Sequence, residues 1–408
     1  MNETLQLTHT RVGDIPLLLG LAIKLDIPTI YDREIGDHGS HTGLSGGWML
    51  AIWMVFILTE SDHTKYNVED WSGRHAELLS RLTGQQVRAG DFNDNRLSSL
   101  LSRLSNRERW ERFESTLWKS SVSVYEIFKP SVGELYGAHC DSTTACGYHQ
   151  AHEQGVMRRG YSKDHRPDLA QLKLMTVAAH PYSYLSATQV ANGKASDESL
   201  YLPLIARASE MLGRAGVLYV GDSKMAALAT RAQITYQGDY YLTVAPIRAE
   251  VEKSLPEWID AALGGAQTLI TLRKENGELI GRGYELIRQC AAQIPTGPEG
   301  EMEAFNFSER LQVIQSEDLR AAQAKSLQDR LRRAHTEIKA LRPEPGRGRH
   351  QYRDEESFKA ALAAVIEKHK VAGLLEVEWE VEEQKETRLI GRGRGSADRP
   401  RREIVKRR

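Results

Sequence analysis

The stretch that decides the fold runs from Leu135 to Thr143 and reads LYGAHCDST. Its first residues are mostly apolar, which predicts a short β-strand that ends on the carboxylate of Asp141. Side chains at the carboxyl ends of strands in α/β sheets project into the crevice beyond the sheet rather than into its packed faces. Asp141 is therefore the first candidate for a functional residue.

A second aspartate has the same setting. Residues 216–220, GVLYV, predict another apolar strand, and Asp222 lies just past it. Between the two aspartates, residues 171–179 begin by alternating and predict a strand, whereas residues 197–212 predict a helix. This alternation of strands and helices predicts an α/β core over residues 126–250.

Three motifs together resemble those of bacterial insertion-sequence transposases of the DDE type. They are DSTT at residues 141–144, YSKDHRPDL at residues 161–169 and LYVGDS at residues 218–223. The second motif is the most specific match, because so many particular residue types in a row rarely coincide by chance. The resemblance covers roughly residues 90–260 and is to the insertion sequence 1634 branch of the insertion sequence 4 superfamily.

The resemblance implies both a fold and an activity. It implies a ribonuclease-H-like catalytic core, a β-rich insertion after the second acid, and a third acid within a signature Y-x2-R-x3-E-x6-K. In intact relatives a metal-activated water hydrolyses the phosphodiester at an element end, and the freed 3′ hydroxyl then attacks target DNA. The implied partners are DNA, as terminal inverted repeats and target, and a second copy of the chain in an active homodimer.

The two aspartates suit a hard divalent ion, Mg²⁺ or Mn²⁺. Mg²⁺ takes oxygen ligands and usually keeps several waters. In two-metal phosphoryl transfer, one ion activates the attacking oxygen while the other stabilises the leaving oxygen. Asp141 would bridge the ions and Asp222 would hold one of them. The alternative for each residue is an aspartate that caps the following turn or helix.

Residues 160–169, GYSKDHRPDL, form a dense run of charged and hydrogen-bonding groups. Such a run cannot be buried without partners, because an unpaired polar group is costly to remove from water. Lys163, His165 and Arg166 could contact DNA phosphates, with Asp164 pairing with one of them. The alternative is an internal salt-bridged turn that orients the sheet.

A rival site is zinc. Cysteine and histidine are the usual zinc ligands, and structural zinc sites commonly pair them at short spacing. However, His139 and Cys140 point to opposite faces if they lie on a strand. The number of residues between Cys140 and Cys146 also differs from the usual spacing of zinc ligands. The alternative to a zinc site is a buried core cysteine with histidines in a polar loop. The residues concerned are His139, Cys140, Cys146, His149 and His152.

Composition sets the outer bounds. At 408 residues the chain is long enough for two or three domains. Its formal net charge of −1 means that any DNA contact must come from local patches rather than from the overall field. Three cysteines argue against a disulfide scaffold and for a reducing cytoplasm. The N-terminus lacks the pattern of a signal peptide, and the longest apolar run is shorter than the ~20 residues that span a bilayer. We therefore expect a cytoplasmic protein with no membrane segment.

Residues 1–125 predict an N-terminal helical domain. Ile15 to Leu25 is an apolar segment, and the run from Trp48 to Leu58 is apolar all round, which places it at the centre of a bundle. Residues 97–104 carry a leucine stripe at helical spacing. The resemblance implies terminal-repeat binding and dimerisation for this domain. A plain structural bundle is the alternative, because no recognition helix with clustered arginine and lysine is evident.

Residues 251–385 predict a β-rich and helical insertion. Thr268 to Leu272 and Leu279 to Leu286 suggest a hairpin that turns near residues 275–277, because Asn-Gly is a strong turn signal. Phe305 to Ile314 predicts a further strand.

Two helices are predicted after this hairpin. An apolar stripe with basic residues on the other face begins at Ser316 and ends at Leu341, and a second helix runs from about Glu355 to Lys370. The basic face could touch DNA, although a solvated charged face is the alternative. Residues 375–382, LEVEWEVE, alternate strictly and predict a half-exposed strand with an acidic outer face.

Residues 386–408 form a basic tail. As a disordered segment it could hold nucleic acid through release of counterions. The sequence contains no match to Y-x2-R-x3-E-x6-K, since Tyr284 and Tyr352 are each followed by arginines at the wrong spacing. We therefore expect the chain to end before its third acid, with the ribonuclease-H-like core incomplete at its C-terminal end. Without that acid the metal pair would be poorly held, so the polypeptide alone is not expected to cleave or join DNA.

Two hypotheses about function follow from these patterns. The first is a DNA transposase of an insertion sequence, incomplete at its third acid. The second is a non-catalytic DNA-binding or dimerising transposase fragment, which occupies terminal repeats or pairs with intact protein. Catalytic competence discriminates between them.

Overall fold

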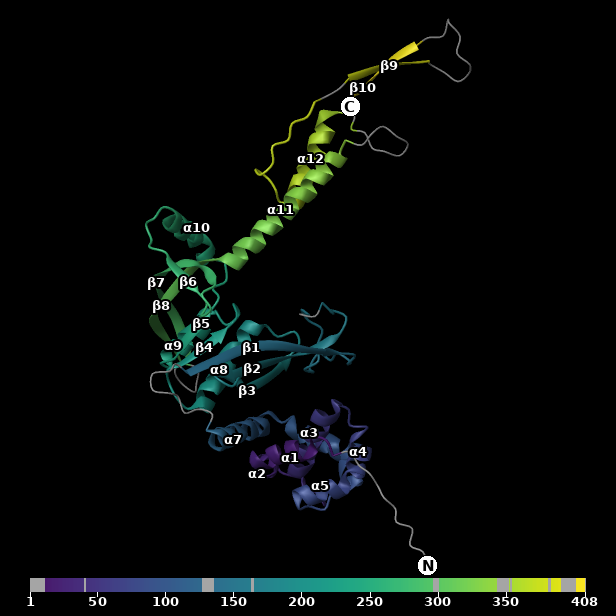
Figure 1. Cartoon of the computed structure of the whole chain (residues 1–408), viewed down its shortest axis with the longest axis vertical. Coiled ribbons are helices and arrows are strands. Elements are labelled where there is room, and N and C mark those ends of the chain that lie inside the picture. The colour runs from purple at the N-terminus through teal and green to yellow at the C-terminus, as the bar shows by residue number, and fades with distance from the viewer. Residues whose placement is uncertain are drawn as a thin grey trace, which may run out of the picture. The chain divides into compact units, whose positions relative to one another are not determined.

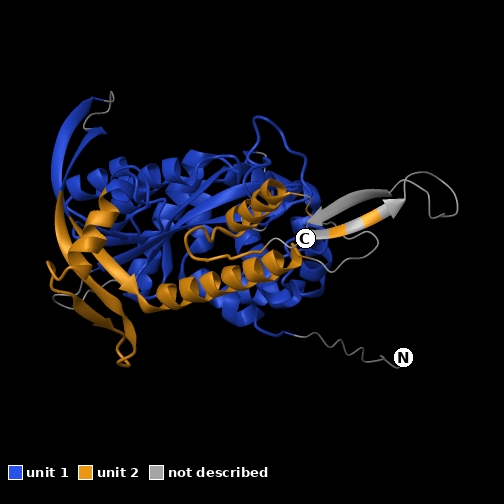
Figure 2. Ribbon diagram, turned by 90° about the horizontal axis from the view of Figure 1, so that it is seen from above, with its two compact units in different colours: residues 1–253, 289–309 blue, residues 254–288, 310–408 orange. Residues whose placement is uncertain are grey.

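The computed structural model is a mixed α/β protein made of two compact units. It describes residues 12–39, 42–126, 136–162, 165–295, 301–342, 352, 354–380, 383–389 and 401–407. Unit 1 comprises Met1–Lys253 and Gln289–Glu309, and unit 2 comprises Ser254–Arg288 and Arg310–Arg408 (Figure 2). The chain thus enters unit 2, returns to unit 1 and then enters unit 2 again. The sequence analysis had instead predicted one continuous insertion over residues 251–385.

The first part of unit 1 is helical, as the sequence predicted for residues 10–120. Most of its helices have 7 to 11 residues, and the two longest have 15 and 19. They are α1 (Ile15–Lys24), α2 (Ile27–Glu34), α3 (Gly46–Glu60), α4 (Val68–Arg74), α5 (Ala76–Thr83), the 3₁₀ turn η1 (Ala89–Phe92), α6 (Asp94–Leu104) and α7 (Arg107–Tyr125) (Figure 1).

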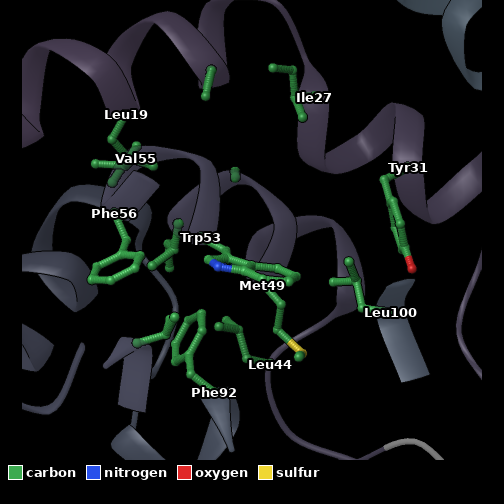
Figure 3. Close-up of a cluster of buried hydrophobic side chains, with 14 of the residues drawn as sticks. Leu19, Ile27, Tyr31, Leu44, Met49, Trp53, Val55, Phe56, Phe92 and Leu100 are labelled. Atoms are coloured by element: carbon green, nitrogen blue, oxygen red, sulfur yellow. The ribbon is translucent and has the colours of Figure 1, made fainter. Parts of the chain in front are cut away.

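Helix α3 is the centre of this helical region. Its side chains Met49, Trp53 and Phe56 are buried in one hydrophobic cluster (Figure 3). The helix begins at two glycines because a Cβ atom at Gly47 would lie 2.0 Å from the carbonyl oxygen of Pro28 in α2. The prediction of a buried central helix for residues 48–58 is confirmed, apart from the exposed Leu58 at its end.

The second part of unit 1 is a five-stranded mixed sheet with the order β3-β2-β1-β4-β5. Strands β1 and β2 and strands β2 and β3 pair antiparallel, whereas β4 is parallel to both β1 and β5. The elements are β1 (Tyr136–Gly147), β2 (Ala170–Ala179), β3 (Tyr184–Asn192), α8 (Asp197–Leu212), β4 (Val217–Gly221), α9 (Leu228–Tyr236) and β5 (Tyr240–Thr243). The helix predicted for residues 197–212 has the same bounds as α8.

One boundary in this sheet was predicted wrongly. Strand β1 does not end at Asp141 but continues to Gly147. The physical reason is that β2 pairs with the whole of β1, from Ala138 opposite Ala179 to Gly147 opposite Ala170. Asp141 therefore lies in the middle of a long strand, although it is still next to the carboxyl end of β4.

Helix α8 covers the buried face of the sheet. Its residues Tyr201, Leu204 and Ile205 pack with Ala138 and Tyr219 of the central strands, and none of the five is measurably exposed. Each fully buried large apolar side chain stabilises the fold by about 1.5–3 kcal/mol relative to exposure. This core fixes α8 on the two strands that carry the aspartates.

Helix α7 contributes to both cores of unit 1. Phe113 packs in the helical cluster and Trp118 in the sheet cluster, where its ring lies 5.7 Å from that of Tyr184. Glu114 of α7 pairs with Arg207 of α8. Burial raises the pKa of the Glu114 carboxyl, and the hydrogen bonds from Thr188 and the charge of Arg207 oppose that rise.

A second sheet has the order β6-β7-β8, with strands β6 (Ile270–Arg273), β7 (Leu279–Pro295) and β8 (Met302–Ser316). The predicted hairpin is confirmed. The amide of Gly277 donates to the Lys274 carbonyl at 2.9 Å, and Gly277 has a φ of +83°, which favours glycine. Helix α10 (Glu250–Leu263) precedes this sheet, and the sequence did not predict it.

Unit 2 ends with a pair of helices and a hairpin. Helices α11 (Glu317–Ala340) and α12 (Glu355–His369) lie side by side (Figure 1), and Glu337 pairs with Lys368 at 2.7 Å. Both helices were predicted. Strands β9 (Glu383–Leu389) and β10 (Arg401–Arg407) pair antiparallel.

Two predictions for this end of the chain are wrong. Residues 375–380 form no strand, because Trp379 packs on α12 instead, with its ring 5.8 Å from Phe358 and 5.5 Å from the Lys359 Nζ. Residues 381 and 382 lie outside the described residues. The basic tail is also not wholly disordered, because β10 finds a partner strand in β9, which a count of charges does not reveal.

No helix in the described residues is both long enough and apolar enough to cross a membrane.

Candidate functional site

The two predicted aspartates are neighbours in the sheet. The parallel register of β1 and β4 pairs Cys140 with Gly221, and the next residues on the two strands are Asp141 and Asp222. Adjacent strands lie about 4.8 Å apart, so the two backbones that carry the carboxylates are in close proximity. Both side chains are exposed. The prediction that distant aspartates meet at one edge of the sheet therefore agrees with the strand register.

Asp141 lies on the face of β1 that points away from α8. Along this strand the buried residues Cys140 and Ser142 alternate with the exposed Asp141 and Thr143, as a pleated strand requires. The amide of Ser142 donates to Asp141 Oδ1 at 2.7 Å. This local bond holds one carboxylate oxygen.

Asp222 is held from two sides. The hydroxyl of Tyr201 in α8 donates to its Oδ1 at 3.0 Å, and the amide of Lys224 donates to the same oxygen at 2.9 Å. Its carbonyl oxygen accepts a 2.6 Å hydrogen bond from the Thr243 hydroxyl of β5. The capping of the following turn, which the sequence offered as the alternative, is thus present and uses only Oδ1.

Tyr201 is influenced by both carboxylates. Its side chain is fully buried, and burial raises the pKa of its hydroxyl well above the usual range. The negative charge of Asp222, the hydrogen bond to it and the charge of Asp141 add to this rise.

A buried polar cluster lies next to Asp141 on the other face of the sheet. Lys173 of β2, which is only 9% exposed, forms an ion pair with Asp197 in the first turn of α8. The hydroxyl of Ser142 donates to the other oxygen of Asp197 at 3.2 Å. Strands β1 and β2 are therefore joined to the start of α8 through these three side chains.

Sequence reasoning missed Tyr201 and Asp197. Both lie in a helix whose bounds were predicted, and residues four apart share one face of a helix. That spacing was a signal that the two polar groups point the same way. Their partners could not be found from the sequence, because they lie on three strands far away along the chain.

The carboxylate pair fits a divalent ion in part. Carboxylate oxygens are the ligands that Mg²⁺ prefers, and Mg²⁺ is often bound by only one or two carboxylates together with waters. No set of three or more histidine, cysteine, aspartate or glutamate side chains that could hold a metal ion occurs within the described residues. Asp141 and Asp222 are thus suited to an ion that retains several waters.

The predicted zinc ligands do not gather in the described part of the chain either. Cys140 points into the core, where burial raises the pKa of its thiol to about 12, whereas His139 is exposed on the opposite face. Cys146, His149 and His152 are exposed. His139 and Cys140 therefore point to opposite faces of β1, as the sequence analysis expected when it argued against a zinc site.

The charged run at residues 160–169 lies beyond the far end of β1. At about 3.3 Å per residue, Gly147 is about 20 Å along the strand from Asp141. Arg166 donates to both oxygens of Asp168, at 2.9 and 2.7 Å, and these bonds lower the pKa of the Asp168 carboxyl. This pair lies on the surface, whereas the alternative from the sequence was an internal salt-bridged turn, with Asp164 as its acid.

The other members of this run have different roles. His165 is exposed and has a φ of +57°, and Lys163 and Asp164 lie outside the described residues. The amide of Arg166 donates to the Ser162 hydroxyl at 3.0 Å, which closes the turn. The DNA contacts of Lys163, His165 and Arg166 stay a prediction.

Comparisons with known proteins give only distant likenesses. No protein family's sequence model matches the chain. No curated protein matches it. Among solved structures it is similar to a Mos1 transposase paired-end complex with the left transposon end, at 12% identity, over 57% of this chain and 74% of that one, with a TM-score of 0.21. It is also similar to the Mos1 strand transfer complex, at 12% identity, over 64% of this chain and 84% of that one, with a TM-score of 0.19.

Proposed function

We propose that this chain is a DNA transposase of the DDE type, with Asp141 and Asp222 as two of its metal-binding acids. The observation that carries the proposal is the strand register, which sets the two aspartates side by side after Cys140 and Gly221. The motifs at residues 141–144, 161–169 and 218–223 resemble the insertion sequence 1634 branch, which supports the same conclusion. A ribonuclease-H-like core, cytoplasmic location and an active homodimer belong to this proposal.

The residues of the site have two roles in this proposal, which are metal binding and orientation of the carboxylates. Asp141 and Asp222 are exposed, so a DNA phosphate can reach both. With Mg²⁺ or Mn²⁺ bound, the site would supply an activated water and stabilisation of the leaving oxygen for phosphodiester hydrolysis. Ser142 and Lys224 each hold the Oδ1 atom of one carboxylate through a backbone amide. The second oxygen of each would then be available to hold an ion.

One observation favours a second candidate function. In the residues that the structure describes, no third acid joins the aspartate pair in a metal-binding group. Two carboxylates without a third would hold the divalent ions poorly. The chain would then act without catalysis, by occupying DNA ends or by pairing with intact protein. This candidate differs from the first in catalysis and not in DNA binding.

The test uses the whole chain and duplex DNA carrying the inverted repeats that flank its gene. Binding is measured by gel shift, and strand nicking is measured with Mg²⁺ or Mn²⁺. If the first proposal holds, nicking by the wild type falls by about a hundredfold or more in Asp141→Asn and in Asp222→Asn. Asp260→Asn, which removes an exposed acid of α10 outside the site and outside the charged run, is the matched control and should nick normally.

Each outcome decides between the candidates. Nicking that survives in both site variants contradicts the assignment of the aspartates. Binding by the wild type without any nicking supports the non-catalytic fragment. Absence of both binding and nicking refutes a role at these DNA ends.

A further inference from the structure

Helix α8 contacts the site through two polar side chains on one face. Asp197 and Tyr201 are four residues apart, so they lie one above the other on the helix. Asp197 contacts Ser142 of β1 and Lys173 of β2, whereas Tyr201 contacts Asp222 just past β4. The first two turns of α8 thus join three strands at the level of the two aspartates.

Tyr201 is held firmly by the core. Its side chain is fully buried and packs in the same cluster as Ala138 and Cys140 of β1 and Tyr219 of β4. Cys140 immediately precedes Asp141, and Tyr219 lies three residues before Asp222. The ring therefore has a fixed position relative to both strands that carry the acids.

The hydroxyl of Tyr201 is a donor and not an acceptor toward Asp222. An ionised carboxylate accepts hydrogen bonds and cannot donate them, so the phenol hydroxyl is the donor in the 3.0 Å bond to Asp222 Oδ1. The Lys224 amide donates to the same Oδ1 atom at 2.9 Å. Two donors from different directions on one oxygen fix the plane of the carboxylate, and Oδ2 is left without a partner in the described part of the chain.

We propose that Tyr201 is a positioning residue that orients the Asp222 carboxylate for a divalent cation. The inference rests on the proposed function, because it assumes that Asp222 binds the ion. Side chains that hydrogen-bond to metal-binding carboxylates orient the ligands, and their loss typically lowers metal affinity by 10- to 100-fold. Tyr201 touches neither the ion nor the DNA.

A simpler role for Tyr201 is packing alone. Buried tyrosines usually find a partner for the hydroxyl, and the ring of Tyr201 fills the core whatever its hydroxyl does. The two roles separate in Tyr201→Phe, which keeps the ring and removes only the donor. A packing role predicts a change in stability without a change in metal binding.

The experiment measures Mn²⁺ binding to the whole chain without DNA. Free Mn²⁺ is followed by electron paramagnetic resonance during titration of the wild type, Tyr201→Phe, Tyr184→Phe, Asp141→Asn and Asp222→Asn. We expect Tyr201→Phe to bind Mn²⁺ roughly 10- to 100-fold more weakly than the wild type. Tyr184→Phe is the matched control, because it removes a hydroxyl that bonds at 2.6 Å to Ser121 in the same unit, and it should bind like the wild type.

A second measurement observes Tyr201 itself in the wild type. With tyrosine labelled by carbon-13 at Cζ, the Tyr201 resonance is assigned by its absence from Tyr201→Phe. Addition of Mg²⁺ should shift it in the wild type and leave it unchanged in Asp222→Asn. If Tyr201→Phe is unfolded by circular dichroism, a label placed by selective incorporation at position 201 gives the same readout.

The possible results separate the two proposals. Equal Mn²⁺ affinity of Tyr201→Phe and wild type, with loss in Asp222→Asn, overturns the positioning role and leaves the proposed function standing. Equal affinity in Asp141→Asn, Asp222→Asn and the wild type refutes the metal site itself. Weakened binding in Tyr184→Phe as large as that in Tyr201→Phe shows a general effect of removing hydroxyls and also overturns the inference.

Discussion

The middle of strand β1 and the turn beyond its far end hold their polar side chains in different ways. Beside Asp141, the contacts are made by buried groups from distant parts of the chain, such as Lys173 and Tyr201. Beyond Gly147, Arg166 pairs with Asp168 two residues away, on the surface. The stretch with the most distinctive sequence is therefore the one that satisfies its polar groups locally.

This difference matters for the strength of each arrangement. An exposed ion pair contributes little because water and salt screen it, with typical values of about 0–1 kcal/mol. A buried ion pair is different, since removal of one partner leaves an uncompensated charge away from water. We therefore expect substitutions near Asp141 to have much larger effects than substitutions in the Arg166 turn.

The largest expected effect is that of Lys173→Met. The substitution removes the cation that pairs with the largely buried Asp197 side chain, which should lower the free energy of unfolding by about 3–5 kcal/mol. Urea denaturation followed by circular dichroism measures the change. The double variant Lys173→Met/Asp197→Leu removes both charges and should recover most of the loss. A single variant as stable as the wild type would show that the pair is not desolvated.

A smaller effect is expected for Gly193→Ala. A Cβ atom at this position would lie 2.1 Å from the carbonyl oxygen of Gln171 and 2.6 Å from that of Arg158, so the backbone at these residues must shift. Overpacking of this kind costs about 1–3 kcal/mol, and thermal unfolding measures it.

Gly20→Ala is the control for Gly193→Ala. Gly20 lies in helix α1, and a Cβ atom there would meet nothing within 4 Å. Alanine should therefore stabilise the helix by about 0.5–1 kcal/mol. Equal stability of both variants would contradict the close approach of the backbones at Gly193.

The smallest expected effect is that of Arg166→Ala. The guanidinium holds the pKa of the Asp168 carboxyl below its ordinary value, so the variant should titrate at a higher pH. Because the pKa is lowered in the folded state, the stabilisation is present at neutral pH and is lost as the pH falls through the Asp168 pKa. Nuclear magnetic resonance titration of the Asp168 side-chain carbon measures the shift. Identical titration in both proteins would mean that Arg166 is not paired in solution and is available for DNA phosphates.

Local patterns in the sequence predicted most elements of the sheet and its helix. Helix α8 and the turn at Gly277 follow from periodicity and from an Asn-Gly pair, which act within a few residues. The strand proposed for residues 375–382 failed because alternation cannot tell a paired strand from an extended segment that packs one large side chain, Trp379, on a helix. The pairing of β10 with β9 was not predicted, because the partner strand is a separate segment of the chain and the composition of the tail does not reveal it.

The site was predicted in part for the same physical reason. Asp141 and Asp222 were singled out because each comes after a short apolar run, which is a local signal, although β1 continues past Asp141. Their adjacency depends on the parallel register of β1 and β4, and no residue pattern encodes that register by itself. The partners Tyr201 and Lys173 required knowledge of which strands α8 covers.

The short length of β4 has a consequence for water. Beyond Cys140, β1 keeps its β2 partner but has no strand on its other side within the described residues, because β4 stops at Gly221. The sheet therefore has a notch, and Asp141 and Asp222 lie at its inner corner. Backbone groups along the notch have no strand partner there, so those that no side chain satisfies, as Asp141 Oδ1 satisfies the Ser142 amide, must take their hydrogen bonds from water.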